Sequence, residues 1–360
     1  MTRGRMGGTG WIGGMLALAA VVAVDAHKPI TSKYTYSEDV YPIVKAHCGA
    51  CHVAGGIAPM SLLTYEDARP WAESIRLELT TGHMPPWYGD PGVAALRDDH
   101  TLSPRDLDVV LTWATGGTPA GPAMKADAST PRRDWARGRP DIVIAVPEAV
   151  TLAADKREDS REFVLRETND RDRLIAFADV LPGNPAIVHD ATVFTRRPDD
   201  RTPTTVIAEW IPGESPAPPS YGFPWHAGEQ LVVRVHYKKN WKLENKPASD
   251  RSRIGLYLAR PTARPVRAVG IQTGKPTTTD AAVKAIAVRT SGVATDARVE
   301  VEAIRPDGSR VAVAGFAVRP GWNRRYWLAR AIDLPKGSRL EATAAAERVE
   351  PIQLWLDVLP

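Results

Sequence analysis

The sequence predicts a multidomain protein in which a small all-α domain precedes an all-β region of two β-sandwiches. Short amphipathic segments bounded by capping residues and glycines fill the first third, and short alternating segments recur from Asp141 onward. The 31 Pro and 28 Gly are spread through all 360 residues. That spread is typical of many short strands and turns, and a composition that is 43% hydrophobic and 24% charged suits ordinary globular cores.

The N-terminal segment, residues 1–26, has the layout of a secretory signal peptide. Arg3 and Arg5 form a basic start, and Trp11 to Val24 is uncharged and mostly apolar, with small residues near its end. An uncleaved N-terminal membrane anchor is the alternative, because the uncharged stretch counted from Met6 reaches 19 residues. Both alternatives predict that the rest of the chain is exported, for example to a periplasm.

Three helical segments are expected in residues 27–118. Each is bounded by residues that favour helix ends: a capping Ser or Thr at the start and, in the last two, Gly after the end. Pro70 is expected to interrupt the middle helix. The segments are Tyr36–Ala50 with Ser37 as cap, a helix from Thr64 to Gly82, and a helix from Ser103 to Gly116.

The first of these helices ends in Cys48-Gly49-Ala50-Cys51-His52. A CxxCH sequence is the attachment site of c-type haem, in which the two sulfurs bond the vinyl carbons and the histidine ligates the iron. A zinc knuckle would need two further ligands, and the chain has only these two cysteines. Cys48, Cys51 and His52 therefore predict haem c in a cytochrome c domain spanning 27–118.

Three residues are candidates for the second axial ligand: Met84, His83 and Met60. Met60 follows His52 by only 8 residues, which leaves little chain to pass around the haem. The segment Met84-Pro85 resembles class I cytochromes c, in which a methionine followed by proline supplies the distal sulfur. Met84 is therefore the favoured ligand and Met60 a core residue. Pro59 is similar to the proline whose carbonyl orients the proximal histidine in those proteins.

The remainder of the chain divides into a Pro-rich linker at 119–140, a first sandwich at 141–262 and a second at 263–360. Asp307-Gly308 predicts a hairpin turn. The expected strands contain Ile142–Ile144, Thr192–Phe194, Thr205–Ile207, Leu231–Val235, Ile254–Leu258, Val299–Val301 and Val311–Val313.

Two segments of the first sandwich carry a second resemblance. Pro185–Phe194 is similar to the His-His strand of the copper type II, ascorbate-dependent monooxygenases, such as peptidylglycine α-hydroxylating monooxygenase. Val233–Tyr237 resembles the segment that supplies the third histidine of the same copper. The resemblance implies two β-sandwiches, each binding one copper. Bacterial proteins that join a cytochrome c domain to this module carry segments like Ile57–Leu62 and His83–Trp87.

Departures from that family imply a degenerate module. His189-Asp190 stands where the first copper has two adjacent histidines. Val288–Ala294, which matches the second-copper segment, contains no histidine, and the sequence has no His after His236 and no Met after Met124. Because those enzymes activate oxygen at the second copper, the resemblance does not predict their oxygen chemistry here.

One metal site is still a candidate in the β region. His189, Asp190 and His236 form a His/His/carboxylate set that suits a divalent metal such as copper, and His226 is a possible addition. The alternative is a relic, with the histidines buried and hydrogen-bonded inside a sandwich.

Charge is distributed unevenly along the chain. Residues 27–120 carry a net charge of −4, whereas 121–360 carry +7, a contrast that favours internal docking or a charged partner. Lys238, Lys239 and Lys242 are expected on a solvated face or a partner-docking edge. Basic runs interleaved with aromatics are lacking, which argues against nucleic-acid binding.

These observations predict an exported c-type cytochrome that carries single electrons, with the β region as a docking or structural module. Its partner would be a redox protein, and a membrane-bound electron-transfer complex would suit this role. The alternative is a haem-fed, copper-dependent oxidoreductase that retains one metal at His189 and His236. Electron transfer is favoured over monooxygenase activity.

Overall fold

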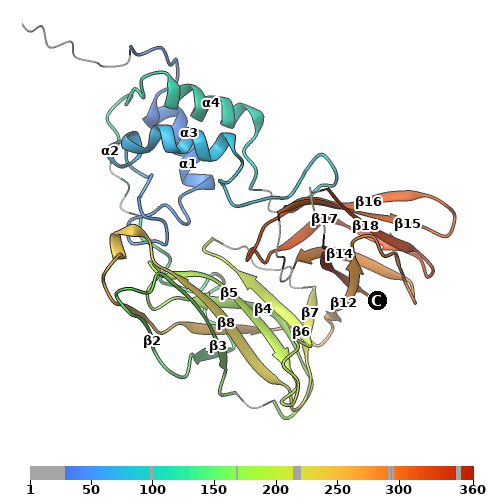
Figure 1. Cartoon of the computed structure of the whole chain (residues 1–360). Coiled ribbons are helices and arrows are strands. Elements are labelled where there is room, and N and C mark those ends of the chain that lie inside the picture. Colours follow the sequence, from blue (N-terminus) through green and yellow to red (C-terminus); the bar gives the residue numbers. More distant parts are fainter. Residues whose placement is uncertain are drawn as a thin grey trace, which may run out of the picture.

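The protein is described here by a computed structural model of residues 29–360, except 98–99, 126, 128, 168, 214–219, 291–292, 294–295 and 346–349. It is rich in β-structure: short helices come first and several sheets follow (Figure 1). The suggested signal segment, residues 1–26, lies outside the described residues. Within the described ranges, none of the helices combines the length and apolar character needed to cross a membrane.

The helical elements all precede residue 116, apart from one short turn among the strands. They are η1 (a π-helical turn, Tyr36–Val40), α1 (Tyr41–His47), α2 (Tyr65–Ala68), η2 (Arg69–Trp71), α3 (Ala72–Thr80) and α4 (Pro104–Thr115), followed much later by η3 (Trp241–Leu243).

Two of the three expected helix caps are confirmed. The Thr64 hydroxyl accepts a hydrogen bond from the Asp67 amide at 3.1 Å, and the Ser103 hydroxyl accepts one from Asp106 at 3.1 Å. The expected Ser37 cap is wrong: the helical path begins at Tyr36, and the N-cap is Thr35, two residues before Ser37. That first helix also ends at His47 instead of Ala50.

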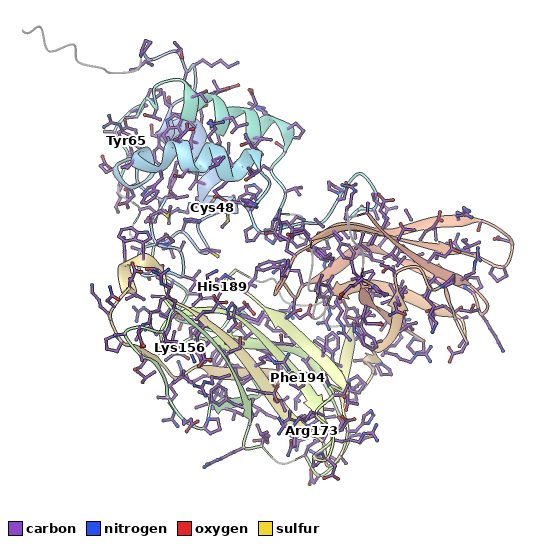
Figure 2. All side chains as sticks on the ribbon, in the orientation of Figure 1. Cys48, Tyr65, Lys156, Arg173, His189 and Phe194 are labelled. Carbon is purple, nitrogen blue, oxygen red and sulfur yellow. The ribbon has the colours of Figure 1, made fainter. Side chains whose placement is uncertain are left out.

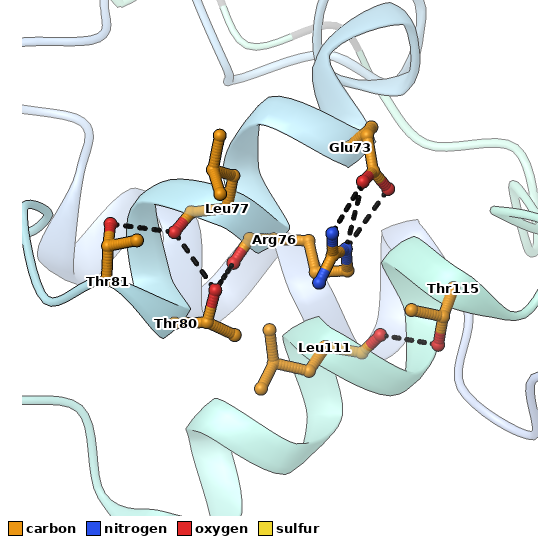
Figure 3. Close-up of polar contacts among 7 residues, drawn as sticks. All are labelled: Glu73, Arg76, Leu77, Thr80, Thr81, Leu111 and Thr115. Carbon is orange, nitrogen blue, oxygen red and sulfur yellow. Dashed lines mark hydrogen bonds and ion pairs between the residues drawn. The ribbon is translucent and has the colours of Figure 1, made fainter.

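The middle helix is interrupted at Pro70, as expected, by the 3₁₀ turn η2. The C-terminal turns of α3 and α4 carry threonines whose hydroxyls donate back to main-chain carbonyls (Figure 3). Thr81 donates to Leu77 and Thr115 to Leu111, each at 2.9 Å. The Leu77 carbonyl also accepts the Thr81 amide, so the hydroxyl adds a second hydrogen bond to a carbonyl that already has a main-chain donor.

A separate hydrophobic core holds the helices together. Helix α4 packs against α3 and η1, and Trp113 is fully buried beside Tyr36, their ring centroids 5.8 Å apart. The Tyr36 hydroxyl donates to the Leu62 carbonyl at 2.7 Å, which ties the chain after the CxxCH motif to this core.

Eleven strands follow as far as residue 265. They are β1 (Ile142–Ala145), β2 (Val150–Leu152), β3 (Glu158–Val164), β4 (Arg173–Leu181), β5 (Val188–Arg196), β6 (Thr205–Trp210), β7 (Tyr221–Trp225), β8 (Gln230–Lys238), β9 (Ala248–Asp250), β10 (Arg253–Leu258) and β11 (Arg264–Pro265). They form sheets of order β1-β10-β4-β7-β11 and β3-β8-β5-β6, with the pair β2-β9.

Eight more strands complete the chain. They are β12 (Arg267–Gln272), β13 (Thr277–Thr278), β14 (Val283–Thr290), β15 (Ala297–Ile304), β16 (Arg310–Val318), β17 (Arg325–Leu334), β18 (Arg339–Ala345) and β19 (Gln353–Leu359). Their two sheets have the orders β12-β19-β14-β17 and β13-β18-β15-β16. Asp307-Gly308 lies in the β15–β16 hairpin, with Gly308 at φ 82°, as the sequence predicts.

Each pair of larger sheets encloses one core, in a sandwich-like arrangement. The first β unit, β1–β11, and the second, β12–β19, lie side by side below the helices in Figure 1. A buried ion pair within the second unit lies beside their contact: Arg325 Nε in β17 is 2.6 Å from Asp357 in β19. The same guanidinium donates to the carbonyls of Ile207 and Val206 in β6, at 2.8 and 2.7 Å. Arg325 therefore joins the two β units.

The segment Trp87–Arg97, which we call the arm, lies on the second β unit. Gly89 pairs with Phe316 and Leu96 with Leu328 in isolated β-bridges, and Trp87 and Leu96 are buried in the second unit's core. This packing was not predicted, because it joins residues more than 200 positions apart along the chain.

The expected linker, 119–140, packs first on the helices and then on the first β unit. The Tyr36 amide donates to the Pro119 carbonyl at 2.9 Å, and the Tyr41 hydroxyl donates to the Asp127 carboxylate at 2.7 Å. Arg132 makes two hydrogen bonds of 2.6 Å to the buried Asp179 carboxylate, which also accepts one from Trp210 Nε1 at 3.2 Å. The Trp135 ring lies so close to Gly255 that a Cβ there would meet it at 2.8 Å. These contacts hold the linker in place.

Candidate functional site

The CxxCH motif lies at the C-terminal end of α1. The Cys48 amide donates to the Val44 carbonyl at 2.8 Å, and the His52 amide donates to the Cys48 carbonyl at 2.9 Å, so the helical path continues into the motif. A Cβ at Gly49 would lie 2.8 Å from the Lys45 carbonyl oxygen, so glycine is required at this position.

The two cysteines are free thiols. Burial raises the pKa of Cys48 to about 12 and that of Cys51 to about 11, and the nearby positive charge of Arg324 partly offsets the effect at Cys51. Both sulfurs are therefore protonated near neutral pH. Protonated thiols suit a site that forms thioether bonds, whereas a metal site would need thiolates.

His52 is oriented by the chain that follows it. Its Nδ1 lies 3.3 Å from the Met60 carbonyl oxygen, and the Leu62 amide donates to the His52 carbonyl at 3.1 Å. The expected partner, the Pro59 carbonyl, is thus replaced by that of the next residue. Burial lowers the pKa of His52, which favours the neutral imidazole that can ligate iron through Nε2. The two thiols and this imidazole suit a thioether-linked haem.

The three candidates for the second axial ligand lie in different settings. Met60 packs on the helical core together with Cys48. Met84 is 41% exposed and lies outside that core. His83 Nδ1 contacts the Thr81 hydroxyl at 3.1 Å. The structure therefore brings only Met60 into the same core as the motif, and Met84 projects from the loop after α3.

The motif faces the β units. Figure 2 shows Cys48 on the side of the helical region nearest to them, with His189 across the intervening space. The Asn240 amide donates to the Ile57 carbonyl at 3.3 Å, and the Trp71 and Trp241 rings lie 6.4 Å apart. A Cβ at Gly213 would come within 2.6 Å of Ala50. Loops of the first β unit therefore cover the motif region.

A second candidate site lies in the first β unit, where β5 and β8 pair. His189, Asp190 and His236 each offer a ligand atom, and these atoms all lie within 4.8 Å of one another. The β5–β8 register shifts between Val188 and Asp190, so a bulge interrupts the alternation of side chains. This bulge lets two consecutive residues, His189 and Asp190, contribute to one site.

Asp190 links the two histidines. Its Oδ2 is 2.7 Å from Nδ1 of His189 and 2.7 Å from Nδ1 of His236. Burial alone would raise the pKa of Asp190, but these two hydrogen bonds outweigh it and the pKa is lowered. The hydrogen bond to Asp190 also raises the pKa of His236.

Glu158 on β3 completes the cluster and was not predicted from the sequence. Its Oε1 lies 2.7 Å from His236 Nε2, so both ring nitrogens of His236 face carboxylates. That arrangement favours a doubly protonated ring, and a metal would have to displace a proton from it. Glu158 reaches this site because β3 pairs with β8, with Ser160 opposite His236.

Two other expectations for this region are wrong. His226 lies apart from the cluster: its Nδ1 is 3.3 Å from Asp172, and it adds no ligand. Lys239 is buried instead of solvated, and its Nζ donates to the Lys246 carbonyl at 2.7 Å. In the segment that matches the second-copper position, Arg289 Nε is 3.3 Å from the buried Asp357.

A series of aromatic rings connects the His189 site with the arm. The His189 ring is 6.5 Å from Trp322, which is 5.9 Å from Tyr88 in the arm. Trp322 belongs to the connection between β16 and β17, so the second β unit supplies a wall of the His189 site.

Comparisons with known proteins add little. No protein-family profile and no curated protein matches the chain. Among solved structures, the turret protein A223 of Sulfolobus turreted icosahedral virus is 7% identical, covering 61% of this chain and 98% of its own, with a TM-score of 0.16. The tandem CBM22 domains of Paenibacillus barcinonensis Xyn10C are 11% identical, covering 59% and 82%, also at 0.16. Scores this low carry no argument about function.

Proposed function

We propose that the protein is an exported c-type cytochrome, an electron carrier with one covalent haem in its helical domain. The observation that carries this proposal is the CxxCH motif with two free, protonated thiols and a neutral, oriented His52. A haem bound there would supply single-electron redox chemistry.

Each residue has a distinct part in the proposal. Cys48 and Cys51 would hold a haem through thioether bonds, since addition of S–H across a vinyl bond needs no external oxidant. The Met60 carbonyl orients the His52 ring through Nδ1, so Nε2 would be the ligand to the iron. Met84, on the exposed loop after α3, is the proposed distal ligand, and its exposure means that the loop must turn toward the iron.

The β region is proposed as the docking and structural module. It covers the motif region through Asn240 and Trp241, and its net charge is opposite in sign to that of the helical region. A charged surface on either region favours docking of an oppositely charged redox partner, such as a membrane-bound complex. This electrostatic attraction weakens as the salt concentration rises. An exported location follows from the signal-like residues 1–26.

The test is heterologous expression with a signal peptide and the haem-attachment machinery. We expect haem to remain with the polypeptide on a denaturing gel, and the Cys48→Ala, Cys51→Ala double variant to lose it. Haem that migrates away from the wild-type chain would contradict the proposal. The Ser309→Ala variant, which makes the same kind of change in the β15–β16 hairpin of the second β unit, is the matched control.

A second candidate function is a haem-fed, copper-dependent oxidoreductase. The observation that favours it is the convergence of His189, Asp190 and His236 within 4.8 Å. Copper titrated into metal-free protein should bind one equivalent, and the His189→Gln, His236→Gln double variant should lose this binding. His226→Gln is the control, because His226 lies outside the cluster. Equal binding by wild type and double variant would rule this candidate out.

A further inference from the structure

Met84 lies on a short bridge whose two ends are attached to different parts of the protein. At the first end, the amides of His83 and Met84 donate to the Glu78 carbonyl of α3, at 3.0 and 3.2 Å. At the second end, Trp87 is buried in the core of the second β unit. The turn toward the iron that the proposed function requires of Met84 is therefore confined to the residues between these two attachments.

Tyr88 attaches the second end of this bridge to the second β unit. Its carbonyl accepts the Ala317 amide of β16 at 2.9 Å, which fixes its main chain on the edge of that strand. Its ring packs on two side chains of the β16–β17 connection: the Arg319 guanidinium carbon is 4.8 Å from the ring centre, and the Trp322 ring is 5.9 Å away. Main chain and ring are thus attached to the same β unit.

The hydroxyl of the same side chain reaches back to the bridge. It donates to the carbonyl of His83, the neighbour of Met84, at 3.5 Å. Burial raises the pKa of Tyr88, so this hydroxyl stays protonated and can donate at neutral pH. Because 3.5 Å is long for a hydrogen bond, we expect the packing of the ring to contribute more than the hydroxyl. Tyr88 therefore contacts both the second β unit and the residue before Met84.

We propose that Tyr88 is a positioning residue for Met84, through which the second β unit keeps the Met84 thioether available to the haem iron. This inference rests on the proposed function and deepens it. A ligand on a tether that is fixed at both ends competes with dissolved ligands at a high effective concentration, and loosening one attachment lowers that concentration. Replacing a residue that orients a metal ligand typically changes the affinity by about 10–100-fold.

The experiment is a titration of the oxidised, full-length holoprotein with imidazole, a nitrogen ligand that competes with a thioether for iron. Loss of the weak far-red band of methionine-ligated iron measures the displacement of Met84. Wild type is compared with Tyr88→Ala, Tyr88→Phe and Tyr257→Ala. Tyr257 is the matched control, because its hydroxyl also donates to a main-chain carbonyl, that of Gly138, but on the first β unit.

We expect Tyr88→Ala to bind imidazole about tenfold more tightly than wild type. Tyr88→Phe keeps the ring and should stay near wild type, and so should Tyr257→Ala. Equal imidazole affinity in wild type and Tyr88→Ala overturns the inference. A Tyr257→Ala variant that binds imidazole as tightly as Tyr88→Ala overturns it too, because the effect would then be a general loosening of the protein.

A second measurement needs no variant, because the coupling between two sites is reciprocal. If Tyr88 holds Met84, displacing Met84 with imidazole loosens Tyr88 in return. The Ala317 amide, which donates to the Tyr88 carbonyl, should then exchange its hydrogen faster in wild type with imidazole bound than without it. Hydrogen exchange followed by mass spectrometry measures this, and an unchanged exchange rate overturns the inference.

The outcomes separate this inference from the proposed function. Covalent haem in wild type without the far-red band overturns the positioning role of Tyr88 and leaves the electron carrier standing. A wild-type chain without covalent haem overturns the proposed function and this inference together.

Discussion

The Asp190 carboxylate lies 2.7 Å from Nδ1 of His236, across the β5–β8 pair. The Glu158 carboxylate lies 2.7 Å from the other ring nitrogen. In the metal-free protein this arrangement is a hydrogen-bonded ionic cluster, and its behaviour with pH distinguishes it from an inert pair of core histidines.

The pKa shifts define the pH range in which this cluster stabilises the fold. The raised pKa of His236 means that its stabilisation is complete below the ordinary value of 6.5 and is lost as pH rises through the higher value in the folded state. The lowered pKa of Asp190 means that its contribution is present above 3.8 and is lost as pH falls through the lower folded value.

We therefore expect His236→Gln to destabilise metal-free protein most at about pH 5–6, by about 1–3 kcal/mol, with the difference shrinking as pH rises. Urea unfolding of wild type and variant across this range measures it. A difference that stays constant with pH would show that His236 does not titrate with Asp190.

Metal binding at the same cluster should compete with protons. Because His236 must lose a proton to act as a ligand, copper affinity should rise with pH between about 6 and 8. Asp190→Asn should weaken binding by about 10–100-fold, since Asp190 holds both histidine rings. Calorimetric titration measures both effects, with His226→Gln as control. Affinity that is independent of pH would mean that the ligands lie elsewhere.

The distal haem ligand can be assigned by spectroscopy. Oxidised wild-type protein should show the weak far-red absorption band that a methionine sulfur on haem iron produces, and methionine ligation should raise the potential. Met84→Ala should remove the band and Met60→Ala should retain it. If Met60→Ala removes the band and Met84→Ala does not, the partly buried Met60 on the core beside the motif is the ligand.

Arg325, which donates to the first β unit through Ile207 and Val206, is paired with Asp357 of its own unit. Asp357→Ala leaves a buried guanidinium without its carboxylate, and we expect it to cost about 3–5 kcal/mol. The exposed pair Lys284–Asp333 is a matched control, and Asp333→Ala should cost less than about 1 kcal/mol. Thermal or urea unfolding measures both. Similar losses in the two variants would show that burial at Asp357 has little energetic effect.

The sequence predicted features that depend on neighbouring residues. The caps at Thr64 and Ser103, the interruption at Pro70 and the turn at Asp307-Gly308 each follow from local backbone chemistry, and the structure has all four. The convergence of His189, Asp190 and His236 was also expected, on the basis of a family resemblance.

Features that depend on residues distant in sequence were not predicted. Glu158 joins the His236 site only because β3 pairs with β8, and nothing near Glu158 in sequence indicates that pairing. The arm lies on the second β unit through Gly89 and Leu96, and Arg132 fixes the supposed linker to Asp179. Each contact is decided by how separate elements pack, which local patterns do not encode.

The most direct test of the central claim is the mass of the intact, denatured protein after expression with haem-attachment machinery, together with its visible spectrum. We predict a polypeptide heavier by one haem, whose absorption resists extraction with acidified organic solvent, and a Cys48→Ala, Cys51→Ala variant with the mass of the polypeptide alone. A wild-type chain with the polypeptide mass alone, or haem that is extracted into the solvent, would contradict the account.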